Sequence, residues 1–218
     1  AELCLADRDG PAVKEAAAEL GGTPYVADLA EDGAIDTLPT AVDVVVNNAG
    51  LQHVAPLHEF PPERFTHMHR VMVLAPFLIL RRTLPGMYER GWGRVINIGS
   101  VHGRRASAYK SAYVSAKHAI EGLSKVVAVE GGPYGVTSNC IDPGYVRTPL
   151  VERQIAEQAR LHGIPEKEVI GRVLLERSVI KRLVEPEEVA AAAVWLCSGA
   201  ARSVTGTSLT IDGGWTAT

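Results

Sequence analysis

The strongest constraint on the fold is a regular alternation of short apolar runs with longer helical patterns. Apolar runs of strand length occupy residues 3–6, 24–27, 43–47, 94–98, 137–141 and 208–211. Helical patterns occupy residues 11–20, 61–88, 108–130 and 187–197, and a polar helical segment covers 148–183. Apolar strands that alternate with helices are typical of a parallel sheet covered on both faces. Crossovers in such sheets are right-handed, so the sequence predicts a doubly wound α/β fold in a single domain, residues 1–218.

Composition narrows the classes of function. The chain carries a net charge of −3 and lacks the clustered basic charge of a nucleic-acid surface, so no nucleic-acid partner is expected. The apolar runs are short and no signal peptide is recognised, which predicts a cytoplasmic protein with no membrane partner. Cys4, Cys140 and Cys197 are widely spaced among apolar neighbours. We therefore expect free buried thiols and no metal site.

Polar and glycine-rich residues follow several of the predicted strands. They are Asp7, Asp28, Asn47 to Gly50, Gly99-Ser100 and Pro143-Gly144. Ligands of doubly wound sheets bind beyond the carboxyl ends of the strands. We therefore expect these residues to meet at one edge of the sheet, around a ligand.

The sharpest chemical signal is Tyr113-Val-Ser-Ala-Lys117, with Ser100 thirteen residues upstream of the tyrosine. Helix positions four apart share a face, so Tyr113 and Lys117 point the same way. The ammonium group is expected to lower the pKa of the phenol from its usual value of about 10, which lets the tyrosine exchange a proton with a substrate oxygen. Ser100 can hold that oxygen by a hydrogen bond. The alternative is a surface pair without a catalytic role, because Y-x-x-x-K alone matches many chains by chance.

Further motifs accompany this set: Asn47-Asn48-Ala49-Gly50, the run from Asp142 to Pro149, and Asp212-Gly213-Gly214. Together, and in this order over the whole chain, they resemble the short-chain dehydrogenase/reductase family. That family has a single Rossmann-like domain and transfers a hydride between a nicotinamide cofactor and an alcohol or ketone. The resemblance implies that Ser100, Tyr113 and Lys117 are catalytic. It also implies a set of cofactor-binding residues: Asp28, Leu29, Asn48, Ala49, Gly50, Tyr113, Lys117, Pro143, Gly144, Val146 and Thr148.

Asp7 bears on the choice of dinucleotide. It follows the first strand, where an acidic side chain accepts hydrogen bonds from ribose hydroxyls and repels a 2′-phosphate. This favours NAD over NADP, although Arg8 next to it works against that preference. The alternative is a solvated aspartate in a turn.

Two departures from the family pattern affect these expectations. The glycine-rich phosphate loop, T-G-x-x-x-G-x-G, is absent from the sequence. We expect the first strand, that loop and the following helix to be missing ahead of Ala1, and dinucleotide affinity to collapse without them. Met72 stands where the family usually has an asparagine that supports a proton-relay water. A thioether hydrogen-bonds water poorly, so slower catalysis or another relay route is expected.

A second set of polar residues is left unexplained by cofactor binding: Gln52, His102, Lys110, Gln154 and Trp215. A cation, a titratable ring and two amides suit a small carboxylate, although each residue alone could be an ordinary exposed side chain. Here the chain resembles the 3-hydroxybutyrate dehydrogenases of the family. The resemblance implies that Gln52, His102, Lys110 and Gln154 hold the substrate carboxylate, with Ser100 and Tyr113 at the reacting oxygen. It also implies that Trp215 closes the pocket, that residues 148–183 form a lid, and that (R)-3-hydroxybutyrate is oxidised to acetoacetate with NAD.

Two other functions stay open at this stage. One is a short-chain dehydrogenase/reductase for another hydroxy acid, a sugar or an acyl thioester. The other is a non-catalytic family member that serves in binding or assembly, which Met72 and the absent glycine loop would suit. The family commonly forms homotetramers through the helix that carries the tyrosine, and the face of Ala119, Leu123, Val126 and Val127 is compatible with that assembly. We therefore expect a homotetramer.

Overall fold

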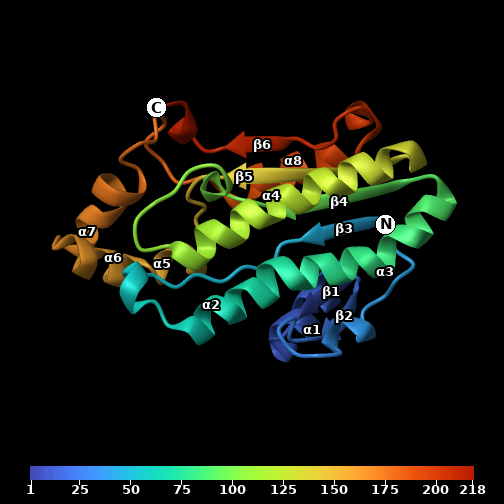
Figure 1. Cartoon of the computed structure of the whole chain (residues 1–218), viewed down its shortest axis with the longest axis horizontal. Helices are drawn as coiled ribbons and strands as arrows, with labels where there is room; N and C mark the ends of the chain where they lie inside the picture. Colours follow the sequence, from blue (N-terminus) through green and yellow to red (C-terminus); the bar gives the residue numbers. More distant parts are fainter.

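The computed structural model describes all of residues 1–218 and contains six strands. They are β1 Cys4–Asp7, β2 Thr23–Val26, β3 Val44–Asn47, β4 Gly93–Ile98, β5 Val136–Pro143 and β6 Ser208–Ile211. All strand pairs are parallel. β1 pairs with β2, and the remaining strands follow the order β3-β4-β5-β6 (Figure 1). The predicted Rossmann-like parallel α/β fold is confirmed.

The sheet is divided into two hydrogen-bonded parts, which the sequence did not predict. No ladder joins β1 to β3, so one edge of β3 is unpaired, and Val44 and Val46 are 38% and 51% exposed. In Figure 1 the unit of β1, α1 (Gly10–Leu20) and β2 forms the blue region below α3. The strand and glycine-rich loop expected ahead of Ala1 lie outside the described residues.

Helices cover both faces of the four-stranded part. They are α3 Ala75–Arg90 and α4 Ser111–Gly131 on one face, and α8 Pro186–Cys197 on the other, while α2 Pro62–His69 packs on α4. Neighbouring residues of β4 show the division, because Val95 packs with Leu80 and Met87 of α3, whereas Ile96 packs with Leu196 of α8. This alternation follows from the two-residue period of a strand. Each such side chain stabilises the fold by roughly 1.5–3 kcal/mol when fully buried.

The helical stretch predicted at residues 61–88 runs from Pro62 to Arg90. A π-helical turn, η3 Arg70–Leu74, separates α2 from α3 and accounts for the predicted internal break. By length and composition alone the stretch is long and apolar enough to cross a bilayer. In this fold it lies on the sheet, where Leu80 and Met87 are buried.

The predicted lid segment forms short helices at one end of the molecule. They are α5 Pro149–Glu152, α6 Ile155–His162 and α7 Glu166–Val169, followed by a π-helical turn, η6 Ile170–Leu174. Val151, Ala159, Val169 and Leu174 give the segment a small core of its own. Residues 175–183 are not helical. Figure 1 shows these orange helices beside the N-terminal end of α4, which is the end that carries Tyr113.

Candidate active site

The three residues predicted to be catalytic meet at the carboxyl edge of the sheet. Ser100 follows β4 and caps the short turn η4 Val101–Gly103, where its Oγ accepts a hydrogen bond of 3.2 Å from the backbone N–H of His102. Tyr113 and Lys117 lie one turn apart on α4, which packs against η4. Ser100 and Tyr113 line the same pocket, and Nζ of Lys117 lies 5.5 Å from the centre of the Tyr113 ring. All three groups can therefore reach one ligand.

Lys117 is almost completely buried, and the backbone holds its amine. Its Nζ donates to the carbonyl oxygen of Ile98 at 2.6 Å. Burial lowers the pKa of Lys117 to about 8. An ammonium group has three N–H donors, so two remain for a ligand. This donor set fits the ribose hydroxyls of a nicotinamide dinucleotide.

The pKa of Tyr113 differs from the sequence-based expectation. Burial raises it to about 12, although the hydrogen bond from Ser100 works in the opposite direction. The sequence predicted a lowered pKa for Tyr113, because the spacing brings a lysine charge close to the phenol. The spacing does not show how much hydration the phenol loses when it is buried. A buried phenol loses the hydration that stabilises its phenolate. Burial therefore holds Tyr113 in its neutral form.

Lys110 and His102 form a second polar group beside Tyr113. Nζ of Lys110 donates to the hydroxyl of Tyr145 at 2.9 Å and lies 3.4 Å from Nε2 of His102. Burial lowers the pKa of Lys110 to about 8, and burial together with the charge of Lys110 lowers the pKa of His102 to about 3. A neutral imidazole whose Nε2 accepts from an ammonium group carries its proton on Nδ1. Nδ1 is buried without a hydrogen-bond partner, so its N–H is available to donate to a ligand.

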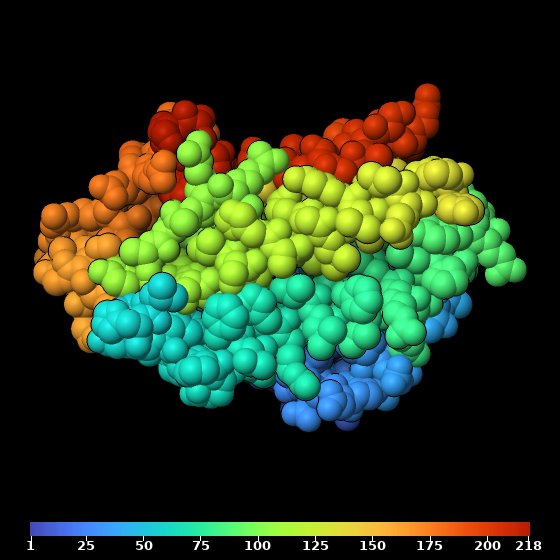
Figure 2. Space-filling model, in the orientation of Figure 1, coloured from blue at the N-terminus to red at the C-terminus, as the bar shows by residue number.

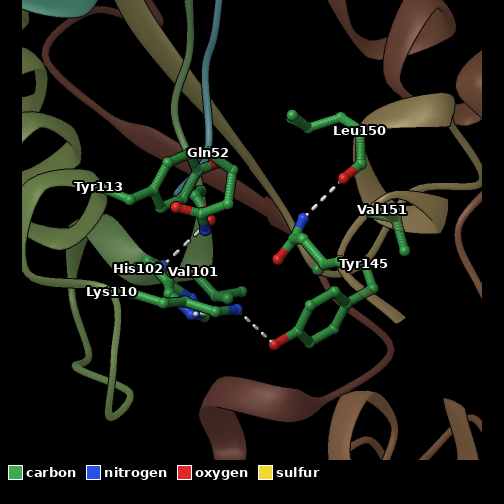
Figure 3. Close-up of a pocket in the computed structure, with 11 residues that line it drawn as sticks. Gln52, Val101, His102, Lys110, Tyr113, Tyr145, Leu150 and Val151 are labelled. Carbon is green, nitrogen blue, oxygen red and sulfur yellow. Dashed lines mark hydrogen bonds between the residues drawn. The ribbon is translucent and has the colours of Figure 1, made fainter. Parts of the chain in front are cut away.

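These groups line a partly open pocket with about 370 Å³ of empty space (Figure 3). Gln52 and Gln154 also line it, as predicted, together with apolar side chains of Val101, Leu150 and Val151. Gln154 comes from the predicted lid segment. Its Nε2 donates to the carbonyl oxygen of Leu150 at 2.8 Å, and its Oε1 is buried without a partner. In Figure 3 Tyr145 and the lid residues face the labelled polar residues across the cavity.

Trp215 lies behind the pocket and does not line it. Its ring stacks on His102 with 5.7 Å between centroids, and the guanidinium of Arg177 lies 4.5 Å from the centre of the same ring. It therefore fixes the plane of the imidazole, whereas the sequence predicted that it closes the pocket. Tyr145 is the lining residue that the sequence analysis left without a role. The available signal was its place directly after Pro143-Gly144 at the end of β5.

Apart from Tyr113 and Lys117 on α4, the residues predicted to hold the cofactor lie at the carboxyl ends of four strands. Asp7 ends β1, Asp28 and Leu29 follow β2, Asn48, Ala49 and Gly50 follow β3, and Pro143 to Thr148 end and follow β5. Oδ1 of Asp7 accepts from the N–H of Asp9, and Oδ1 of Asp28 accepts from the N–H of Ala30, both at 2.9 Å. Oδ2 of Asp28 lies 3.9 Å from Arg8. The second oxygen of Asp7 is left for a ligand, which is the chemistry that a ribose diol needs.

The parallel α/β fold and the Ser–Tyr–Lys arrangement at its edge define an oxidoreductase of the short-chain dehydrogenase/reductase family, and this chain belongs to that family. A family model described as Enoyl-(Acyl carrier protein) reductase matches residues 1–216. Among curated relatives, the chain is 49% identical over 175 residues to a D-beta-hydroxybutyrate dehydrogenase from Rhizobium meliloti (strain 1021). The aligned residues cover 80% of this chain and 68% of the relative.

Two solved structures share this fold. A 4-hydroxyisoleucine dehydrogenase complexed with NADH has a TM-score of 0.86 and 28% identity, with 99% of this chain and 88% of that chain covered. A gluconate 5-dehydrogenase from Burkholderia cenocepacia J2315 in complex with NADP and tartrate has a TM-score of 0.84 and 29% identity, with 100% and 86% covered. These relatives support a nicotinamide dinucleotide as cofactor.

Proposed function

We propose that this protein oxidises (R)-3-hydroxybutyrate to acetoacetate with NAD, reversibly, and that Tyr113 is the general base. The observation that carries the proposal is a buried cation beside the catalytic set, because Lys110 shares a pocket with Ser100 and Tyr113. A buried ammonium group is unfavourable without a compensating anion. A substrate carboxylate would provide that anion. The similarity to a D-beta-hydroxybutyrate dehydrogenase supports the same substrate.

Each catalytic side chain has one task at the reacting oxygen. Ser100 donates a hydrogen bond to the substrate hydroxyl, and Tyr113 takes its proton. The oxidised nicotinamide, when bound, supplies the hydride acceptor and a positive charge that favours the phenolate. Lys117 holds the ribose with its two remaining N–H groups, and its charge also favours the phenolate. The alcohol carbon loses a hydride while the oxygen loses its proton, which leaves a ketone.

The carboxylate binds at the other end of the pocket. The ammonium group of Lys110 and Nδ1–H of His102 donate to it, while Tyr145 keeps Lys110 in place by accepting its hydrogen bond. Val101, Leu150 and Val151 provide apolar contacts for the short methyl end. A charged, partly closed pocket of this kind suits a free acid of small size.

The choice of NAD over NADP depends on Asp7. Its carboxylate is exposed at the end of β1, where it would bind ribose hydroxyls and repel a 2′-phosphate. Arg8, which could favour NADP, is directed toward Asp28 at 3.9 Å. This pairing weakens the attraction of Arg8 for a phosphate and supports NAD.

The test is NADH formation by the purified protein with (R)- and (S)-3-hydroxybutyrate, other hydroxy acids, sugars and a 3-hydroxyacyl thioester, each with NAD and NADP. We expect the highest kcat/KM for (R)-3-hydroxybutyrate with NAD. Tyr113→Phe should lower kcat by roughly 10²–10⁴-fold, because it removes the general base, and should leave NADH binding by fluorescence unchanged. Activity on sugars or thioesters alone would replace the proposed substrate. Failure of the protein with its natural N-terminus to bind NADH at millimolar concentration would favour a non-catalytic protein.

A further inference from the structure

A buried pair of carboxyl groups lies behind the catalytic set and has no role in the mechanism above. Asp142 is 0% exposed near the end of β5, and Glu121 is 6% exposed on α4, one turn after Lys117. Oδ1 of Asp142 and Oε1 of Glu121 are both buried without a hydrogen-bond donor, and both lie beside Gly99. A Cβ added to Gly99 would lie 2.1 Å from Oδ1 of Asp142 and 3.3 Å from Oε1 of Glu121. The pair therefore lies against the residue that precedes Ser100.

Two ionised carboxylates in contact repel each other, and burial adds the loss of hydration. A hydrogen bond between them requires a proton. Burial, followed by the hydrogen bond and the charge of Glu121, raises the pKa of Asp142 to about 8. The pair thus carries one negative charge at neutral pH and two at alkaline pH.

Arg104 connects the pair to the loop that carries the substrate-binding residues. It follows η4, and its Nε lies 3.3 Å from Oδ2 of Asp142. It also donates to the carbonyl oxygen of Ser208 on β6 at 3.0 Å, and the hydroxyl of Ser208 donates to Oε2 of Glu121. Gly99, which the pair lies against, directly precedes Ser100. The pair therefore joins the end of β4 and the η4 loop to α4, β5 and β6.

The same charge acts on the catalytic groups. Burial lowers the pKa of Lys117, and the negative charge of the nearby Asp142 and Glu121 pair works in the opposite direction. The charge of Asp142 also adds to the larger effect of burial in raising the pKa of Tyr113. One negative charge thus keeps Lys117 protonated, while a second would suppress the phenolate of Tyr113.

We propose that Glu121 and Asp142 share one proton and are positioning residues, whose single charge fixes Arg104 and keeps Lys117 protonated. The inference rests on the proposed dehydrogenase function. Release of the shared proton separates the two carboxyl groups and adds a charge that opposes phenolate formation at Tyr113. The pair therefore limits alcohol oxidation at alkaline pH.

The test has one readout that does not depend on activity. Infrared difference spectra of the intact protein should show one protonated carboxyl at neutral pH that ionises near a pH of about 8. The signal should be absent from both Glu121→Gln and Asp142→Asn, because an amide keeps a hydrogen bond and does not titrate there. Wild-type spectra without such a group would overturn the proposal even if the protein proves to be a dehydrogenase.

The second readout is the pH profile of kcat/KM. We expect the ratio of activity at about pH 9 to activity at about pH 7 to rise in Glu121→Gln by up to tenfold, which is the change that one pKa unit produces. Glu130→Gln, at an exposed position on the same helix, is the matched control and should keep the wild-type ratio. Identical profiles in wild type and Glu121→Gln would reject the positioning role. Absence of all dehydrogenase activity, with the infrared signal present, would reject the proposed function and leave the shared proton established.

Discussion

At the residue scale, burial controls the ionisation of the site more than neighbouring charges do. The pKa of Lys110 and of Lys117 falls to about 8, and that of Tyr113 rises to about 12, all with burial as the largest cause. Each shift favours the neutral form of its group. Ligand charges are therefore part of the electrostatic balance of this pocket, because an anion beside Lys110 restores the ammonium form.

Lys110 gives a prediction about pH. Its pKa is lowered to about 8, so the ammonium group is present below that pH and is lost as the pH rises through it. We expect the KM for (R)-3-hydroxybutyrate to rise above a pH of about 8, while a smaller change is seen in kcat. Lys110→Met should raise KM by roughly 10- to 150-fold, the effect of about 1.5–3 kcal/mol for a charged hydrogen bond, and should flatten the dependence of KM on pH.

Steady-state kinetics between neutral and alkaline pH measures this effect, and NADH binding by Lys110→Met is the control. Loss of cofactor affinity equal to the loss of substrate affinity would show that Lys110 belongs to the cofactor site. A KM that rises with pH equally in wild type and Lys110→Met would assign the titration to another group.

At the element scale, the junction of α2 and α3 determines what surrounds the catalytic helix. The π-helical turn η3 places Met72 in a buried cluster with Met68, Val71, Ala112 and Ala116, against which Tyr113 packs. Met72 is 3% exposed. The family pattern has an asparagine at this position, and here the thioether fills apolar space next to α4. Packing therefore explains why methionine is tolerated.

The prediction for this element concerns stability. Met72→Asn should lower the free energy of unfolding by about 1–3 kcal/mol, because it buries an amide where methionine made apolar contacts. Met72→Leu, which conserves volume, should cost less than about 1.5 kcal/mol. Urea denaturation followed by circular dichroism compares the variants. A Met72→Asn protein as stable as wild type would show that water reaches this cluster and satisfies the amide.

At the scale of the whole molecule, the order of the elements was predictable and their hydrogen-bonded grouping was not. Runs such as residues 94–98 and the helix that carries Tyr113 were found because apolar periodicity marks them directly. The break between β1 and β3 could not be found, since strand pairing is a property of distant segments. The sequence did predict the Ser–Tyr–Lys arrangement. It missed Tyr145 in the pocket and the contact between Glu121 and Asp142 for the same reason, since these contacts join distant segments.

The family resemblance predicts a homotetramer, and we propose that the exposed apolar side chains of α4 form its interface. Figure 2 shows α3 and α4 side by side across one surface. The predicted interface face is corrected in part, because Val127 is buried in the core and Leu123 packs against it. Val126 and Val129 of α4 are 52% and 78% exposed. Apolar side chains at such positions favour association, because burial removes them from water.

We expect a tetramer in sedimentation velocity, and Val129→Glu should shift it to smaller species, since an unpaired buried charge costs about 3–5 kcal/mol. Leu57→Glu, at a site that is 77% exposed on η2 (Leu57–Glu59), is the control and should sediment as wild type. A wild-type monomer would contradict the expected assembly, and a tetramer that survives Val129→Glu would place the interface on another face.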